Sequence, residues 1–478
     1  MAETKPLVLD VDGTFLKTDI LFECFWGGLG KDPFAVLGTA ARNFTRPAVL
    51  KRDLAKIAKL RTDLLPVNTD MLQMAQDCSS AGREVVLASA SHQPLVSQLA
   101  ADHGLSERVF ASDGETNLKS KAKAAALTAA YGEGGFDYAG NEAIDYPIWE
   151  QADAVLMVGQ HDKIESALKA AGKTVTKYDG RWRKRDLIKG LRPHQWVKNV
   201  LLFLPMLAAH EFNFATLLMV VLGIVAFSAA ASAIYIVNDL LDLEADRLHP
   251  KKRNRPFASG AVPIWVGMAA SILSGLVAIG IGAILGMSFL AIVLVYMALS
   301  LTYSLRLKRA RWIDIATLAT LYSLRVVAGA AAGQVDVTGF MLVFVFPVFI
   351  TLGCVKRLTE LSLATGDDRL PGRGYSRADR SNLLNIAGLG TVGALLIFFA
   401  YSFTQQAQLL YPTQWMLWAA LVPIAAWLIR MVRLGYFGKQ DYDPIVFAMR
   451  DKRGLGLLMI TLSMMFYGAG LWQEWFGF

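Results

Sequence analysis

Three carboxylates with helical spacing follow a long apolar run. The run covers residues 215–237, and the acids are Asp239, Asp242 and Asp246. Because these positions lie at i, i+3 and i+7, a continuing helix would present all three on one face. Close like charges repel unless cations lie between them, and such oxygen ligands suit Mg²⁺ that bridges to phosphate. The spacing therefore predicts a diphosphate site.

A basic segment directly behind the acids supplies partners for phosphate. Lys252 offers a point charge, whereas Arg253 and Arg255 can each make two parallel hydrogen bonds to phosphate. The alternative interpretation is a helix end that meets a charged cytoplasmic loop. A carboxylate at membrane depth costs about 2.5 to 3.5 kcal/mol on insertion scales, so three without a function are unfavourable.

The composition divides the chain into a soluble part and a membrane part. The chain has 478 residues, of which 54% are hydrophobic, yet residues 1–190 resemble a soluble protein. The net charge of +8 lies mainly in loops between apolar segments, where membrane topology explains it more simply than nucleic-acid binding. The three cysteines have no metal-ligand spacing, which fits a reducing cytoplasmic setting. No signal peptide is expected before the first strand.

Residues 1–180 are predicted to form an alternating α/β domain. Its first expected strand ends at Asp10 and leads into a turn that contains Asp12, Gly and Thr. Two carboxylates released by a strand into a glycine turn can face one phosphate, with a metal ion between them and the phosphate. A second buried strand ends at Ser89, Lys123 lies in an expected helix, and Asp145 follows a glycine-containing loop.

This set resembles the haloacid dehalogenase (HAD) phosphatase superfamily. The resemblance implies a Rossmann-like α/β domain with a helical cap. It also implies that Asp10 is the nucleophile that forms an aspartyl-phosphate and that Asp12 is the general acid/base. Ser89 and Lys123 would hold the phosphoryl group, and Asp145 would complete a Mg²⁺ site with the first two aspartates.

One residue departs from that family pattern. Asn141 stands after Gly140 where an aspartate is usual, and a neutral amide is a poorer Mg²⁺ ligand. An inactive or regulatory domain is therefore the alternative. Lys119 and Lys121 are rivals of Lys123 for the lysine role.

A basic, aromatic linker is expected at residues 181–195. Leu187, Ile188 and Leu191 fall at helical spacing, so an amphipathic helix on anionic lipid headgroups is predicted. A simple stop signal for the first span is the alternative, and the two interpretations are compatible.

Residues 196–478 are predicted to form an all-α membrane domain of about nine spans. The spans are 196–211, 214–240, 261–285, 288–305, 312–333, 339–357, 382–403, 413–433 and 454–474. Lys and Arg gather in the loops after the second, fourth, sixth and eighth spans, and the alternate loops have none. The positive-inside rule therefore places the N-terminal domain in the cytoplasm and the C-terminus on the outer side of the plasma membrane.

With this topology, further polar residues at span ends are expected beside the acidic cluster in one cytoplasm-facing pocket. They are Lys198, Tyr303, Lys308, Asp314, Lys356, Arg357 and Glu360. Simpler alternatives exist for several of them. Tyr303 could be an aromatic residue of the membrane interface. Lys308 and Arg357 could only mark the cytoplasmic side of the membrane, and Lys198 could be a side chain that snorkels to the interface.

The membrane part resembles the UbiA-type intramembrane prenyltransferase superfamily. The characteristic motif of that superfamily is present here as Asn238-Asp-x-x-Asp-x-x-x-Asp, followed by Arg255-Pro. Segments that begin at Arg192, Glu244, Tyr303 and Lys356 are most similar to the branch of polyprenyl-phosphate phosphoribosyltransferases. Enzymes that ionise prenyl diphosphates usually carry a second Asp pair near the end of the sixth span. This chain has Lys356, Arg357 and Glu360 there, and the two cations suit an anionic lipid phosphate.

The resemblance implies Mg²⁺-dependent transfer of 5-phosphoribose from phosphoribosyl diphosphate to a membrane polyprenyl phosphate, such as decaprenyl phosphate. The three aspartates would bind the metal and diphosphate, and the N-terminal domain would remove the 5-phosphate of the product. The substrate-binding residues would be Asn238, Lys252 and Arg253 for the diphosphate, Lys198, Lys356, Arg357 and Glu360 for the lipid head, and Tyr303 and Lys308 for the ribose phosphate.

Two other functions stay open from the sequence. The membrane domain could use a prenyl diphosphate to prenylate an aromatic acceptor, with an inactive or regulatory N-terminal domain. It could also be a lipid-phosphate carrier, although transporters place their sites in broken helices at the midplane rather than at one face. The sequence sets neither the chain length of the lipid nor the oligomeric state, so a homo-oligomer is allowed.

Overall fold

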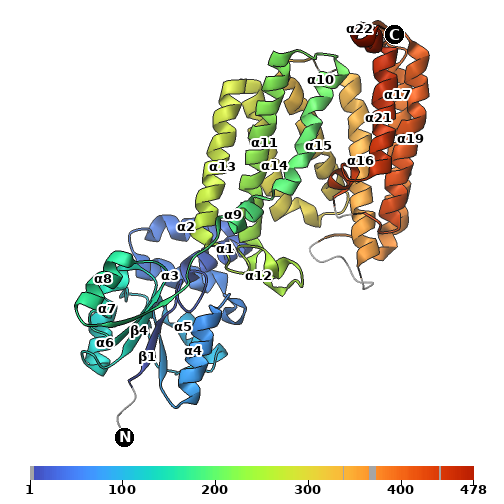
Figure 1. Ribbon diagram of the computed structural model, residues 1–478. Coiled ribbons are helices and arrows are strands. Elements are labelled where there is room, and N and C mark those ends of the chain that lie inside the picture. Colours follow the sequence, from blue (N-terminus) through green and yellow to red (C-terminus); the bar gives the residue numbers. More distant parts are fainter. Residues whose placement is uncertain (1–4, 337, 365–372, 441–442, 478) are drawn as a thin grey trace. The chain divides into compact units, whose positions relative to one another are not determined.

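The computed structural model describes residues 5–336, 338–364, 373–440 and 443–477. The chain forms two compact units (Figure 1). Unit 1 comprises Met1–Leu191 and Tyr235–Ser271, and unit 2 comprises Arg192–Ile234 and Ile272–Phe478. The acidic segment that follows the first long apolar run therefore belongs to the same unit as the N-terminal region.

Unit 1 is built on a six-stranded parallel sheet of order β3-β2-β1-β4-β5-β6. Leu7 of β1 lies opposite Val85 on one side and Asp137 on the other. Because β1 and β4 stand side by side while the chain passes through β2 and β3 between them, the strand order reverses at β1. Ligands of such sheets bind beyond the carboxyl ends of the strands at this reversal. The strands are β1 (Leu7–Asp10), β2 (Val85–His92), β3 (Val109–Ser112), β4 (Asp137–Gly140), β5 (Ala154–Val158) and β6 (Thr174–Tyr178).

Helices cover both faces of the sheet. Leu7 and Leu9 of β1 belong to one buried cluster, and Val8 belongs to another that contains Trp149. This burial on both faces explains why β1 is apolar without alternation. The helices of this part are α1 (Ile20–Lys31), α2 (Pro33–Asn43), α3 (Pro47–Ala58), α4 (Thr69–Ser80), α5 (Gln93–Asp102), α6 (Lys121–Tyr131), α7 (Tyr146–Trp149) and α8 (Asp162–Ala170), with short 3₁₀ turns η1 (Thr62–Leu64) and η2 (Ala143–Asp145).

Helix α1, which follows β1 in the sequence, brings this part of the chain into contact with the acidic segment. Trp26 of α1 lies in a buried cluster with Leu240, Phe257 and Ile264. These residues belong to the end of α11 (Phe214–Leu241), the loop after α12 (Leu243–Leu248) and η4 (Lys252–Asn254), and the start of α13 (Ile264–Leu285). This apolar cluster thus joins residues of unit 1 that are far apart in the sequence.

A buried ion pair accompanies this core. Glu23 of α1 accepts hydrogen bonds from two nitrogens of the Arg247 guanidinium at 3.0 and 2.5 Å. It also accepts one from the Thr18 hydroxyl at 2.7 Å. The third guanidinium donor, Nε, bonds to the carbonyl of Ala258 at 3.0 Å. Because the exposed fractions of the Arg247 and Glu23 side chains are only 7% and 2%, each charge depends on the other.

The linker contains a helix, α9 (Lys184–Leu191), as its spacing predicts. Leu187 and Leu191 pack against the cluster around Trp26, so protein covers their apolar surface. Ile188 is 55% exposed.

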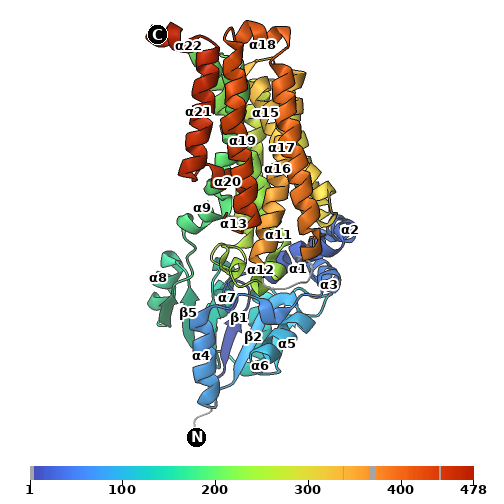
Figure 2. The same cartoon turned by 90° about the vertical axis from the view of Figure 1, so that its right-hand side faces the viewer.

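Unit 2 is helical, as Figure 2 shows from a second direction. Its elements are η3 (Pro193–Phe203), α10 (Leu204–Ala208), most of α11 and part of α13, α14 (Met287–Leu305), η5 (Leu307–Arg309), α15 (Ile313–Gly333), α16 (Gly339–Leu363), η6 (Arg377–Asp379), α17 (Arg380–Tyr401), α18 (Gln405–Leu410), α19 (Gln414–Tyr436), α20 (Pro444–Ala448), α21 (Lys452–Gly468) and α22 (Leu471–Phe476).

The fold prediction is wrong in its number of membrane spans. Within the described ranges, seven helices are long and apolar enough to cross a membrane, not nine. Residues 196–211 form 3₁₀ helix η3 and the five-residue α10 instead of one continuous span. Helix α21 has 17 residues, fewer than the roughly 20 that usually cross the hydrocarbon core. The seven helices are α11, α13, α14, α15, α16, Arg377–Tyr401 and α19.

The HAD assignment in the fold prediction also fails, because the structure supports only a coarser description. The N-terminal region has a parallel six-stranded sheet with helices. This architecture is common to many unrelated α/β proteins, so the fold alone names no superfamily.

Replacing Glu23 by Ala should destabilise unit 1, because it leaves Arg247 charged and buried without a counter-ion. Loss of one member of a buried pair typically costs about 3 to 5 kcal/mol. Thermal unfolding of the full-length protein should therefore begin at a lower temperature. Glu165→Ala is the control, since Glu165 pairs with Lys169 and Lys177 at the surface. Equal melting of both variants would contradict the importance of the buried pair.

Candidate functional sites

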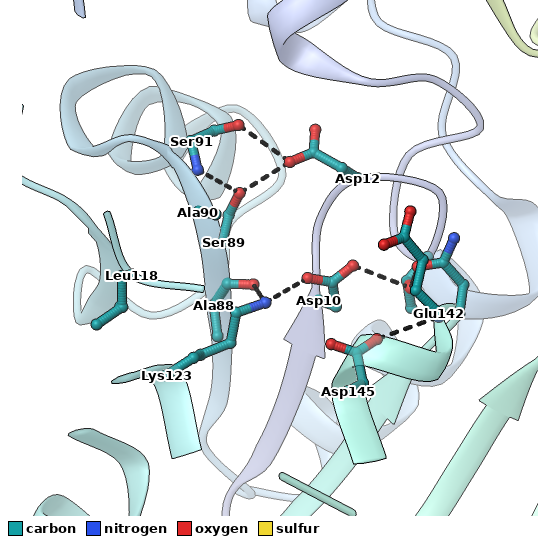
Figure 3. A network of polar contacts seen from close by, with 12 residues as sticks. Asp10, Asp12, Ala88, Ser89, Ala90, Ser91, Leu118, Lys123, Glu142 and Asp145 are labelled. Atoms are coloured by element: carbon teal, nitrogen blue, oxygen red, sulfur yellow. Dashed lines mark hydrogen bonds and ion pairs between the residues drawn. The ribbon is translucent and has the colours of Figure 1, made fainter. Parts of the chain in front are cut away.

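The predicted phosphoryl-site residues of unit 1 meet at the carboxyl ends of β1 and β2 (Figure 3). Asp10 ends β1, and the amine of Lys123 donates a hydrogen bond to it at 2.6 Å. The same amine donates to the carbonyl of Ala88 at 3.3 Å and to the Tyr138 hydroxyl at 3.2 Å. That hydroxyl donates to Asp145 at 3.3 Å. Among the three lysines considered from the sequence, Lys123 is thus the one that contacts Asp10.

Asp12 is held by two serines of β2. The hydroxyls of Ser89 and Ser91 each donate to the same carboxylate oxygen at 3.0 Å. The other oxygen accepts the backbone N–H of Ile20, at the start of α1, at 2.8 Å. Sequence reasoning missed Ser91, although the period of two in a strand places residues 89 and 91 on the same face.

Asn141 lies at this site but in a supporting position. Its side-chain oxygen accepts a hydrogen bond from the Thr14 hydroxyl at 3.2 Å, and the same hydroxyl donates to Asp10 at 3.2 Å. Gly13 is required beside it. This glycine has φ +81°, and a Cβ there would lie 2.2 Å from the Asn141 amide nitrogen.

The electrostatics of this site bring the pKa of Asp10 close to neutral pH. Burial disfavours the charged carboxylate and raises the pKa of Asp10 to about 7. The Lys123 ammonium opposes this shift, and the charges of Asp145 and Asp12 add to it. Burial alone would lower the pKa of Lys123, but Asp10 and Asp145 raise it. An added cation near Asp10 would therefore favour its ionised, nucleophilic form.

The acidic segment of unit 1 does not continue as one helix. Helix α11 ends at Leu241, Asp242 precedes α12, and Asp246 lies within α12. Asp239 and Asp246 are both buried. One nitrogen of Arg255 donates to Asp239 at 3.1 Å and to Asp246 at 2.6 Å. The spacing thus brought the first and third acids to a common partner, although the helix is interrupted.

The partner of these acids is Arg255 rather than Arg253. Lys252 and Arg253 of η4 are exposed. Burial raises the pKa of Asp246, and Arg255 opposes that shift. The side-chain oxygen of Asn238 is buried and has no hydrogen-bond partner in the described part of the chain. A buried oxygen without a partner could accept a donor or bind a hard cation.

Metal binding at either acidic site stays a prediction. In the described ranges, no group of three or more His, Cys, Asp or Glu side chains is arranged to hold a metal ion. Mg²⁺ commonly uses one or two carboxylates and takes its other ligands from water and substrate phosphates. The donor types at both sites fit that pattern.

Unit 2 holds a buried cluster around Arg357 of α16. Its Nε donates to one oxygen of Asp314 at 2.5 Å, and Nη2 donates to the other at 2.9 Å. Nη2 also donates to the Tyr303 hydroxyl at 3.0 Å, while Nη1 pairs with Glu360. Arg373 donates to the same tyrosine hydroxyl at 3.0 Å. Two carboxylates therefore already neutralise Arg357, which favours a positioning role. Lys308 lies in η5, directly after α14.

A second polar cluster of unit 2 joins Lys198 and Lys356 through Asp443. One oxygen of Asp443 lies 2.5 Å from the Lys198 amine and 3.5 Å from the Lys356 amine. The Tyr322 hydroxyl donates to it at 3.3 Å. Burial would raise the pKa of Asp443, but the two ammonium groups hold it well below its usual range. Sequence reasoning missed Asp443, whose signal was an acid directly before Pro444 at a helix start.

A buried arginine of α15 was also missed. Arg325 donates to the side-chain oxygen of Asn199 at 3.0 Å and to the Tyr296 hydroxyl at 2.9 Å. A third donor bonds to the carbonyl of Leu321 at 2.6 Å. A lone arginine inside an apolar span was the available signal, because such charges are rare and face the bundle interior.

Comparisons with known proteins agree with the helical part. The model of the UbiA prenyltransferase family matches residues 200–362. Decaprenyl-phosphate phosphoribosyltransferase of Mycobacterium tuberculosis is 30% identical over 273 residues, which cover 56% of this chain and 88% of that protein. The chain belongs to the UbiA prenyltransferase family.

This UbiA-family chain is also similar to a second relative and to a solved structure. "Uncharacterized protein y4nM" of Sinorhizobium fredii is 34% identical over 469 residues, which cover 96% of this chain and 90% of that protein. A UbiA homologue from Archaeoglobus fulgidus, solved with GPP and Mg²⁺, aligns with a TM-score of 0.44 and 16% identity, and the alignment covers 59% of this chain and 98% of that chain. The first match runs through both the sheet and the helices.

The UbiA match identifies this chain as an integral membrane protein of the prenyltransferase type. The matched range includes the acidic segment and the Arg357 cluster. It begins after Lys198 and ends before Asp443. The pair formed by these two residues therefore comes from the structure alone.

Replacing Asp443 by Asn should destabilise unit 2, because two ammonium groups would then lie together without a carboxylate. The amide oxygen of Asn can still accept the helix-capping hydrogen bonds from Ile445 and Val446, so the change mainly removes charge. The expected cost is about 3 to 5 kcal/mol, seen as earlier thermal unfolding. Asp451→Asn is the control, since Asp451 caps a helix and pairs with the single, partly exposed Arg430. An unchanged melting temperature for Asp443→Asn would contradict the importance of this buried charge.

Proposed function

We propose that the helical part transfers 5-phosphoribose from phosphoribosyl diphosphate to a membrane polyprenyl phosphate. The main support is the similarity to decaprenyl-phosphate phosphoribosyltransferase. The chemistry of unit 2 agrees with an anionic acceptor, since Lys198 and Lys356 share one carboxylate in a buried cluster. A neutral aromatic acceptor would leave this surplus of positive charge without a use.

The donor would bind at the acidic segment of unit 1. Asp239 and Asp246, with Asp242 between them in sequence, would hold Mg²⁺, and the Asn238 oxygen would be a neutral ligand. When bound, the ion would neutralise the diphosphate leaving group. Arg255 now links two of the acids and would donate to the diphosphate instead. The exposed Lys252 and Arg253 would attract the anionic donor.

The acceptor phosphate would be bound by Lys198 and Lys356. A phosphate monoester is already anionic near neutral pH, because its second pKa is about 6. No general base is then required. A bond forms between C1 and an oxygen of the lipid phosphate, while the bond from C1 to diphosphate breaks. Tyr303, fixed by Arg357 and Arg373, would orient the ribose 5-phosphate with Lys308.

The site at the end of β1 would hydrolyse a phosphate monoester. Asp10 attacks phosphorus, and Asp12 gives a proton to the departing oxygen. Water then cleaves the aspartyl-phosphate. Lys123 and Ser89 would hold the phosphoryl group, and Asp145 would help Asp10 to bind Mg²⁺. The transferase product retains a 5-phosphate monoester, which makes it a chemically suitable substrate for the same polypeptide.

Mass spectrometry of lipid products tests both steps. The full-length protein, polyprenyl phosphate, phosphoribosyl diphosphate and Mg²⁺ should yield the dephosphorylated ribose lipid. Asp10→Asn should stop at the 5-phosphate form, and Asp239→Asn should yield neither. Removal of Mg²⁺ with a chelator should abolish transfer.

The outcomes separate the alternatives. The 5-phosphate form from both the parent and Asp10→Asn would retain the transferase and reject this phosphatase role. Absence of any ribose lipid, together with prenylation of an aromatic acid from a prenyl diphosphate, would reject the proposed transfer.

Asn141→Asp should tighten Mg²⁺ binding at the β1 site. A charged oxygen would replace the amide that accepts from Thr14. Changes to groups that support metal ligands commonly alter affinity by about tenfold or more. The Mg²⁺ concentration for half-maximal phosphatase activity should fall accordingly. Gln76→Glu, which adds the same charge at an exposed position of α4, should leave it unchanged.

A further inference from the structure

Helix α2 of unit 1 presents an apolar stripe to its surroundings. Phe34, Leu37, Ala41 and Phe44 lie at i, i+3, i+7 and i+10, so they share one face. Phe44 follows the helix with helical backbone angles and continues the stripe. Phe34 is 84% exposed, Phe44 is 82% exposed and Leu37 is 54% exposed. Val36, which points away from this stripe, is fully buried in the core.

Basic residues accompany the stripe. Lys31, Arg42 and Arg46 are exposed at or near the two ends of the helix. The local acid is Asp32, whose carboxylate caps the helix by accepting from the N–H of Ala35. A helix with exposed Phe and Leu on one face and cationic neighbours has the composition of helices that lie in a membrane interface.

The position of α2 within unit 1 points to a bilayer. Helix α1, which directly precedes it, packs through Trp26 against Leu240 and Ile264. These are residues at the ends of α11 and α13, two of the helices long enough to span a membrane. In both views α2 lies beside α1 (Figures 1 and 2). Trp265, 56% exposed in the first turn of α13, is an aromatic of the kind found at membrane interfaces.

We propose that α2 lies in the headgroup region of an anionic bilayer. Phe34, Leu37 and Phe44 insert among the lipid chains, and Arg42 and Arg46 contact anionic headgroups. A bilayer is favoured over a second copy of the chain because unit 1 contains span ends, which bring a membrane surface to this part of the molecule. The contact would keep the β1 site beside membrane-bound substrates.

Spin labels on the full-length protein in nanodiscs test this contact. Cys24 and Cys354 are buried, so a Cys78→Ser background leaves no exposed native thiol. Nitroxides are placed by Phe34→Cys and Phe44→Cys, and by Gln76→Cys in α4 as a water-exposed control. Nanodiscs contain phosphatidylcholine with or without phosphatidylglycerol. Collisions with oxygen report lipid contact, and collisions with a soluble nickel complex report water.

At positions 34 and 44, the ratio of oxygen to nickel collisions should be severalfold higher than at position 76. Phosphatidylglycerol should raise it further, and the double change Arg42→Gln and Arg46→Gln should remove that increase. Equal ratios at the three positions would overturn the proposal. Strong dipolar broadening between labels at position 34, with nickel and oxygen both excluded, would assign the stripe to a second copy instead. A phosphatidylglycerol effect that survives the double change would refute the role of the arginines.

Discussion

A carboxylate removed from water must have a cation beside it, and every candidate site of this protein is arranged around that requirement. Lys123 forms an ion pair with Asp10, and Arg255 forms ion pairs with Asp239 and Asp246. In unit 2, Arg357 pairs with Asp314, and two lysines pair with Asp443. The protein's own side chains thus provide a counter-charge for a buried carboxylate in each case.

The arrangement of charges differs between the two units, and this difference supports the proposed ligands. In unit 1, Arg255 contacts two buried acids, and this acidic segment would suit a metal ion with a diphosphate. In unit 2, Lys198 and Lys356 are two cations on Asp443, so their cluster has an excess of positive charge and suits an anionic lipid head. The two clusters therefore support different roles in the proposed transfer.

The sequence revealed residues that stand in local motifs and missed residues that are placed only by contacts with distant parts of the chain. Asp10 and Ser89 were predicted because each ends a short apolar run that indicates a buried strand, although β2 continues beyond Ser89 to His92. Asp443 was missed because its contacts with Lys198 and Lys356 depend on the packing of a loop after the eighth predicted span. The short first span was misjudged for another reason. Hydropathy measures composition, whereas residues 196–211 form the end of a 3₁₀ helix that begins at Pro193 and a five-residue helix with Pro205 in its first turn.

The first turn of α1 is attached at both of its ends. The N–H of Ile20 bonds to Asp12, and Glu23, three residues later, bonds to Arg247, the neighbour of Asp246. For evolution, this means that the sheet and the acidic segment are not freely separable modules. Loss of the sheet region, which includes α1, would expose the apolar residues that pack around Trp26 and leave Arg247 without its counter-ion. Fission of this chain into two proteins would therefore demand compensating substitutions on both sides of the break.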